Sequence, residues 1–306
     1  MQATVRSLEV DGVTAEVLDA LLRDGVACLL LKGPVLAGWL YGDGAARHYV
    51  DTDILVGPRG FAAAQRTLTG IGFAPHVDDS DTPGWRQVAH HWVRPRDGAN
   101  VDLHRTLVGV GVGDAELWEV LGADTESIEV RGRKAQTLAP PARARHIALH
   151  AAHHRTRSGK HLDDLERALD QIDIEVWRSA CALAERLSAA GAFAAGLRLC
   201  GAGRRLAGEL ELSDAHSVET ALLAGTPVAG ALGWHYLASA RGLVPRLHIV
   251  ARKAIPTPRF MRAWTPLARR GAPGLAAAYL GRLAWVAGRA VPGFRAWRRA
   301  RRRSGR

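Results

Sequence analysis

The sequence predicts an α+β protein in which a mixed β-sheet with packed helices is followed by an all-helical region. Two apolar segments, 26–31 and 52–56, have the length of buried strands and flank a helical pattern. Farther along, 85–93 and 99–106 alternate between apolar and polar residues, as strands with one buried face do. Beyond residue 139 the pattern is helical and strand signals are absent. We therefore expect the sheet in the first half of the chain.

The N-terminal elements follow from periodicity and from residues that start or stop a helix. Thr14 is suited to cap a helix, and Pro34 is suited to begin one because its missing N–H costs nothing at that position. In chain order we expect a helix over 13–24, a strand over 26–31, a helix over 34–41, a strand over 52–56, a helix over 61–68 and a short strand from residue 72.

Two hairpins complete the predicted sheet. Residues 94–98 have turn chemistry and join the two alternating segments, while Gly132 joins 128–130 to 135–138. The first hairpin is expected to bring Asp102 beside the second apolar strand.

We divide the chain into a core over 1–139, a helical domain over 140–225 and a basic segment over 226–306 that is rich in Arg and Trp. Helices are expected over 142–154, 162–172, 175–189, 192–199 and about 213–223, then in the basic segment over 229–241 and 274–290. The final eight residues are expected to be frayed.

Charge is distributed very unevenly along the 306 residues. All 30 acidic residues lie within the first 219, together with 24 of the 41 basic residues. The remaining 17 basic residues follow with no acid among them. The chain thus combines a slightly acidic body with a strongly basic end, which is typical of proteins with an anionic partner.

Composition and cysteine use indicate a globular cytoplasmic protein. Hydrophobic residues make up 47% of the chain, and no run of about 20 apolar residues suggests a spanning helix. The N-terminal residues are too polar for a signal peptide. Cys28, Cys181 and Cys200 are far apart and lack metal or redox spacing, so they are interpreted as buried thiols.

The stretch from Leu29 to Gly57 contains the first candidate metal-binding and phosphate-binding residues. Asp51 and Asp53 are two residues apart, so in a strand their side chains point to the same face. Two adjacent carboxylates repel each other, and oxygen ligands of this kind suit Mg²⁺ or Mn²⁺. Asp102 on a neighbouring strand would add a third carboxylate, and such a set can hold metals for phosphoryl or nucleotidyl displacement. Gly33, after the first strand, permits close approach of the backbone to a phosphate.

These residues carry a family resemblance. The string Leu31-Lys32-Gly33, Tyr41-Gly42, Arg47, Asp51-Thr52-Asp53-Ile54-Leu55-Val56 and Val101-Asp102-Leu103-His104 resembles the bacterial uncharacterised nucleotidyltransferases of the DNA polymerase β superfamily. The resemblance continues through Leu138-Ala139-Pro140 and the helix at His150 to Asp164, and covers about residues 15–215.

The resemblance implies a polymerase-β-like fold and transfer of a nucleoside monophosphate from an NTP to an unidentified acceptor. It implies Asp51, Asp53 and Asp102 as catalytic residues and metal ligands, with Asp102 as general base. Lys32, Gly33 and Arg47 are the expected phosphate contacts.

Pro34 departs from the superfamily pattern. Relatives carry Gly or Ser after the glycine, whereas proline has neither an amide N–H nor a hydroxyl. Lys32 would then supply the charge at the phosphate. The alternative reading is a catalytically degenerate protein that binds a nucleotide or a partner and is localised by its basic end.

Histidines form a second pattern. His104 and His150 are candidate substrate contacts, since His104 shares a strand face with Asp102 and His150 lies on a helix expected to face the site. His146, His150 and His154 follow at intervals of four, a spacing compatible with a transition metal but better explained by a helix facing the cleft.

Three partners remain open for the basic segment 226–306. Trp residues interleaved with Arg favour nucleic acid. An apolar helix with a narrow basic stripe over 275–294 favours a membrane surface, which would make the protein peripheral to a membrane. An acidic partner, including the chain's own acidic part, is the third.

Overall fold

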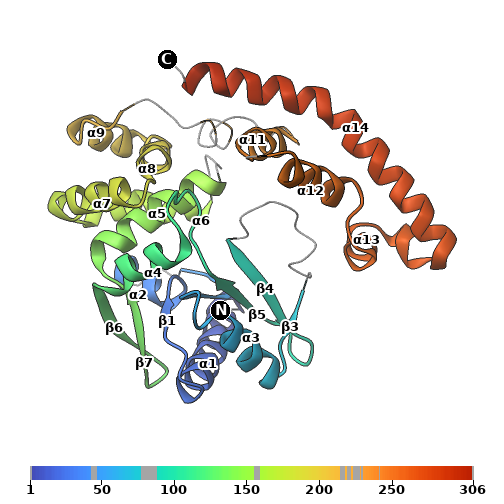
Figure 1. Cartoon of the computed structure of the whole chain (residues 1–306). Helices are drawn as coiled ribbons and strands as arrows, with labels where there is room; N and C mark the ends of the chain where they lie inside the picture. The colour runs from blue at the N-terminus through green and yellow to red at the C-terminus, as the bar shows by residue number, and fades with distance from the viewer. Residues whose placement is uncertain are drawn as a thin grey trace. The chain divides into compact units, whose positions relative to one another are not determined.

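The computed structural model describes residues 2–42, 47–76, 88–154, 159–213, 218, 222, 228, 230–240 and 242–304. Contacts between Cα atoms divide the chain into two compact units. The first contains Met1–His76 and Val88–Asp214, and the second contains the C-terminal residues from Ala215 onward. Figure 1 shows the elements of both units.

The first unit is built on a seven-stranded mixed sheet in the order β3-β4-β5-β2-β1-β7-β6. Its strands are β1 (Cys28–Leu30), β2 (Thr52–Val56), β3 (Ala74–Pro75), β4 (Ala89–Arg94), β5 (Ala99–His104), β6 (Thr125–Val130) and β7 (Arg133–Leu138). The central strand β2 runs antiparallel to β1 and parallel to β5. Both predicted hairpins, β4–β5 and β6–β7, are present. The predicted mixed sheet is therefore confirmed.

Helices cover both faces of this sheet. Leu30 and Ile54 pack into one core with α1 (Gln2–Arg23) and α3 (Phe61–Gly70). Leu29 and Leu55 point the other way and pack into a larger core with the remaining helices. These are α2 (Pro34–Leu40), α4 (Asp114–Gly122), α5 (Pro140–His154), α6 (Lys160–Gln171), α7 (Ile174–Arg186), α8 (Ala190–Leu197) and α9 (Gly201–Glu209). Neighbouring residues of one strand thus pack into opposite cores, because side chains along a strand alternate between the two faces of the sheet.

The second unit is helical. It contains α11 (Ala231–Ser239), α12 (Leu243–Ala254), α13 (Pro258–Trp264), the 3-10 helix η2 (Pro266–Arg269) and α14 (Gly271–Ser304). Among the described residues, no helix has both the length and the apolar composition that crossing a bilayer requires.

Several boundaries differ from expectation. Helices α4, α9, α12 and α13 were not anticipated, and α1 begins eleven residues before its predicted start. Helix α14 is longer than expected, since it continues to Ser304 and includes Pro292 in its interior, and the fraying of the last eight residues stays a prediction. The helix expected over about 213–223 lies almost entirely outside the described residues. The separation of 1–139 from 140–225 as independent domains stays a prediction.

Candidate active site

Asp53 and Asp102 lie at paired positions of the parallel strands β2 and β5. Ile54 and Leu103, next to them in sequence, point into the core on the α1 side. Because strand side chains alternate, Asp53, Asp102 and His104 all point to the opposite face, toward α5. The sheet register therefore brings together two acids that are 49 residues apart in the chain, as expected from the predicted hairpin.

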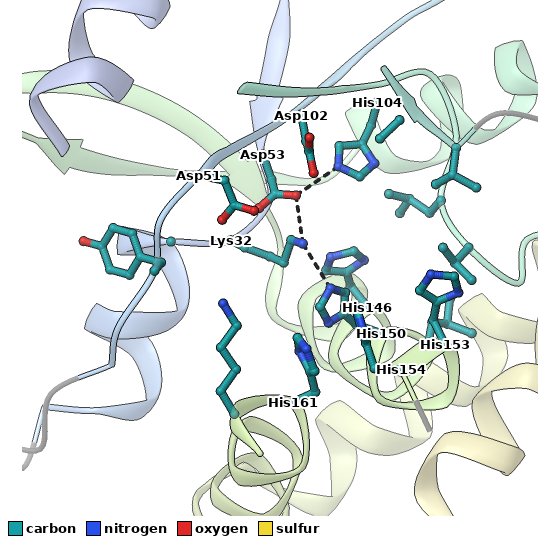
Figure 2. Close-up of a pocket in the computed structure, with 18 of the residues that line it drawn as sticks. Lys32, Asp51, Asp53, Asp102, His104, His146, His150, His153, His154 and His161 are labelled. Carbon is teal, nitrogen blue, oxygen red and sulfur yellow. Dashed lines mark hydrogen bonds and ion pairs between the residues drawn. The ribbon is translucent and has the colours of Figure 1, made fainter. Parts of the chain in front are cut away.

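Lys32 lies between the sheet and α5 (Figure 2). Its Nζ is 2.8 Å from Oδ1 of Asp53 and 3.0 Å from Nε2 of His150. Nε2 of His104 is 3.0 Å from the same carboxylate oxygen. Burial alone would raise the pKa of Asp53, but Lys32 and His104 hold that pKa well below its usual range. Asp53 is consequently an ionised, buried carboxylate.

Asp51 immediately precedes β2 and points to the same side as Asp53 (Figure 2). Its pKa is raised, first by burial and then by the charge of Asp53, with Asp102 adding to the effect and Lys32 opposing it. Burial and the two neighbouring carboxylates together disfavour the charged form of Asp51 more than Lys32 favours it. The donor atoms of Asp53, Asp102 and His104 lie within 4.8 Å of one another. Oxygen-rich, electrostatically crowded donors fit a hard divalent cation.

Asp102 is the most accessible member of the pair, with 28% of its side chain exposed. Its Oδ1 is 2.8 Å from Nδ1 of His91, a neighbour on β4. The Asp102 carboxylate is therefore oriented by His91 and still lines the solvent-accessible cavity that Lys32 also lines.

Gly33 has a backbone conformation that only glycine adopts easily, with φ of +65° and ψ of −120°. A Cβ atom here would lie 3.4 Å from Cδ2 of Tyr49. Pro34 follows as the first residue of α2, where a proline is tolerated. The glycine thus lets the chain turn sharply between β1 and α2.

Arg47 is held by a residue that the sequence did not single out for this role. Its Nε and Nη2 donate to the two carboxylate oxygens of Asp164, each at 2.8 Å, and Tyr41 donates to Oδ1 at 2.8 Å. Both charged side chains are buried. Within the described part of the chain, Nη1 of Arg47 is buried without a hydrogen-bond partner. Asp164 lies on the apolar face of α6 beside Leu165, and this unusual position was the signal available in the sequence.

Histidines form the wall opposite the carboxylates. His146, His150, His153 and His154 extend from α5, and His161 comes from α6 (Figure 2). Burial is the main cause that lowers the pKa values of four of them, to about 4 for His154 and His161 and well below the usual value for His146 and His150. The wall is therefore largely uncharged at neutral pH.

All eight residues predicted as catalytic, phosphate-binding or substrate-contacting line one cavity of about 500 Å³. They are Lys32, Gly33, Arg47, Asp51, Asp53, Asp102, His104 and His150. Sequence reasoning missed Tyr49, Lys160 and His161, which line the same cavity. Two of the predicted phosphate contacts already have protein partners, since Lys32 contacts Asp53 and Arg47 contacts Asp164.

Comparison with known proteins gave four results. A family model described as "uncharacterised nucleotidyltransferase" matches residues 1–202. The antibiotic-resistance factor ANT(2'')-Ia is similar in structure, with 14% identity, a TM-score of 0.43, and coverage of 62% of this chain and 96% of its own. An antigenic nucleotidyltransferase-like protein from Paracoccidioides brasiliensis is similar with 17% identity, a TM-score of 0.36, and coverage of 59% and 93%. A search of curated proteins gave no significant match.

Proposed function

The chain belongs to the uncharacterised nucleotidyltransferase family, and we propose that it transfers a nucleoside monophosphate from an NTP to an acceptor with the help of a divalent metal ion. The observation that carries this proposal is the side-by-side placement of Asp53 and Asp102 on parallel strands, in a cavity that all eight predicted residues line. The acceptor is proposed to present a hydroxyl or phosphate oxygen.

The metal is proposed to be Mg²⁺ or Mn²⁺, with Asp51, Asp53 and Asp102 as its ligands. The crowding that raises the pKa of Asp51, mainly through burial and the charge of Asp53, supports a cation at this position. A bound divalent cation would supply charge neutralisation for the transferring phosphoryl group. Lys32 lies against Asp53 and already provides one positive charge there.

The chain's own residues have distinct proposed roles in the transfer. Asp102 takes the proton of the acceptor hydroxyl as the acceptor oxygen forms a bond to the α-phosphorus. The bond between that phosphorus and the oxygen leading to the β-phosphate breaks, and pyrophosphate leaves. The partial exposure of Asp102 and its hydrogen bond with His91 support this role, because a general base must be both accessible and oriented.

Binding of the triphosphate is proposed to involve Lys32, Gly33 and Arg47. Gly33 provides a backbone without a side chain at the cavity, and Nη1 of Arg47 is the donor that Asp164 leaves available. His104 and His150 are proposed to contact substrate, since both line the cavity.

The first test is calorimetric titration of the four NTPs with Mg²⁺ into the full-length protein and its Asp53→Asn variant. We expect metal-dependent binding of at least one NTP that the variant loses, together with loss of pyrophosphate release. Asp124→Asn, at an exposed position outside the cavity, is the matched control and should behave as wild type. Unchanged binding in a folded Asp53→Asn protein would refute the assigned site.

A catalytically degenerate protein is the alternative, and Pro34 favours it. Tight nucleotide binding without pyrophosphate release, in the presence of Mg²⁺ or Mn²⁺, would support this alternative over transfer.

A second candidate function concerns the C-terminal unit, which we propose binds an anionic phospholipid surface. Helix α12 has no buried residue, and four of its apolar side chains are 50–78% exposed. They are Leu243, Val244, Leu247 and Val250, and the same helix carries Arg246, Arg252 and Lys253. Exposed apolar residues next to cations, in a segment without carboxylates, fit the boundary of an acidic bilayer.

Cosedimentation with phosphatidylglycerol vesicles and with phosphatidylcholine vesicles tests this role. We expect binding to the anionic vesicles that Leu247→Glu weakens. Leu22→Glu, at an exposed leucine of the first unit, is the control. Failure to bind anionic vesicles, or binding to nucleic acid alone, would rule out the lipid surface.

A further inference from the structure

Three histidines in the cavity wall each bring one ring nitrogen close to those of the other two. His150 and His154 are one helical turn apart on α5, and His161 projects from α6 toward both (Figure 2). One nitrogen from each ring can be chosen so that all three lie within 4.8 Å of one another. The ring centroids are 4.6 Å apart for His150 and His154, 4.5 Å for His150 and His161, and 3.8 Å for His154 and His161.

We propose that His150, His154 and His161 bind a transition-metal cation of the Zn²⁺ type. Neutral imidazole is the ligand that such cations prefer, and three protein nitrogens leave a coordination position for water or another ligand atom. Mg²⁺ prefers oxygen ligands, so this site differs in chemistry from the neighbouring carboxylates. The proposal does not depend on the nucleotidyl transfer proposed above.

The hydrogen bonding of these rings supports a ligand role over simple packing. A structural histidine that is buried usually donates or accepts a hydrogen bond at both ring nitrogens. In the described part of the chain, Nδ1 of His161 is buried and has no such partner. The rings of His154 and His161 are stacked against each other, with an angle of 11° between their planes. Each ring therefore has another histidine as its close neighbour, and one of the two rings must turn out of the stack for both to bind one cation.

The contact between Lys32 and His150 distinguishes a metal site from simple packing. Its ammonium group lies 3.0 Å from Nε2 of His150, so this histidine already presents a lone pair to a cation in the cavity. A metal ion bound by the three histidines would be repelled by the nearby ammonium group of Lys32, or would displace that group from Nε2 of His150. In both cases removal of the lysine charge strengthens metal binding. A packing role for the histidines predicts no such coupling.

Titration with Co²⁺ tests the proposal, because Co²⁺ bound by three imidazoles gives a visible ligand-field absorption. The full-length protein is used without a polyhistidine tag. We expect saturable binding of one Co²⁺, displaced by Zn²⁺, that His161→Ala and His154→Ala each weaken more than tenfold. Lys32→Met should tighten binding, and Asp53→Asn should leave the absorption in place.

His153→Ala is the control, since this ring lies on the same helix but is not one of the three converging histidines. Thermal unfolding verifies that each variant is folded, and His161→Gln replaces His161→Ala if the latter is not. Absence of Co²⁺ binding, or equal loss in His153→Ala and His161→Ala, would overturn the proposal. Retained binding in a folded His161 variant would overturn it as well.

Discussion

Arg47 and Asp164 form a two-point ion pair between side chains that are 117 residues apart in the chain. Both carboxylate oxygens accept from the guanidinium at 2.8 Å, and both side chains are almost fully buried. Burial alone would lower the pKa of Arg47, but the hydrogen bonds and charge of Asp164 raise it. The pair connects the segment before β2 to α6 and so fixes the sheet against the helical wall of the cavity.

Asp164→Asn is therefore expected to be strongly destabilising. A buried guanidinium that loses its counter-charge costs about 3–5 kcal/mol in the free energy of unfolding. Denaturant unfolding measures this cost. Glu175→Gln, which removes the exposed partner of Arg178, is the control and should have an effect near zero. A loss below about 1 kcal/mol for Asp164→Asn would mean that the pair does not hold the two parts together.

Gly33→Ala should lower both stability and nucleotide affinity. The backbone conformation of Gly33 is strained for any residue with a Cβ, at a cost of roughly 1–3 kcal/mol. The new methyl group would lie in van der Waals contact with the ring of Tyr49.

Gly38→Ala in the following helix is the matched control, because a Cβ there meets nothing within 4 Å. Alanine at this helical position should stabilise the protein by about 0.5–1 kcal/mol. Denaturant unfolding and NTP titration of both variants give the comparison. Equal behaviour of the two would show that the turn at Gly33 tolerates a side chain.

Much of the sheet and the carboxylate site could be predicted because both depend on local patterns. The strand expected over 52–56 is β2, and the predicted hairpin correctly placed Asp102 beside that strand. The Arg47–Asp164 pair could not be predicted, because only the packing of α6 brings the two residues together.

The helices of the second unit were underestimated for a different reason. The prolines of this segment argue against long helices, yet Pro245 lies in the first turn of α12, where its missing N–H is harmless. Pro292 lies inside α14, and that helix continues beyond it. The long flanking stretches of good helix formers outweigh the one backbone hydrogen bond that this proline removes.

His90 is expected to make folding stability depend on pH. Burial, with smaller contributions from Arg105 and His104, lowers the pKa of His90 to about 4. Between that value and its ordinary pKa of 6.5, the unfolded chain binds a proton that the folded chain does not. Stability therefore falls as pH drops from 6.5 toward 4, by up to about 1.4 kcal/mol per pH unit from this residue.

His90→Phe should make this dependence shallower, since phenylalanine can keep the edge-on contact with Phe61 but binds no proton. Unfolding free energies at pH 5 and pH 7, measured with chelator present, provide the test. His48→Gln, at an exposed histidine, serves for comparison. An unaltered slope in His90→Phe would contradict the assignment.

Arg145 and Arg143 on α5 offer a paired test of buried charge. Arg145 is fully buried, and none of its guanidinium nitrogens has a hydrogen-bond partner in the described part of the chain. Burial lowers its pKa to about 9. Arg143 is also buried but donates to Glu126 and to the carbonyl of Leu138.

Arg145→Met should raise the free energy of unfolding by about 1–4 kcal/mol, because a well-packed apolar side chain relieves the desolvation of an unpaired charge. Arg143→Met should lower it. Chemical denaturation at neutral pH reports both changes. Destabilisation by Arg145→Met would show that Arg145 has a favourable role that its surroundings do not reveal.

Pro34→Ser tests whether the departure from the superfamily pattern limits nucleotide binding. Serine would add an N–H and a hydroxyl beside Gly33, and a hydrogen bond to a charged phosphate contributes about 1.5–3 kcal/mol. We expect NTP affinity to rise at least about tenfold, since 1.4 kcal/mol corresponds to a factor of ten. Pro58→Ser, just after β2, controls for replacing a proline with serine elsewhere. Unchanged NTP affinity in Pro34→Ser would mean that Lys32 and Arg47 already make the contacts that the phosphates need. Pro34 would then no longer support a catalytically degenerate protein.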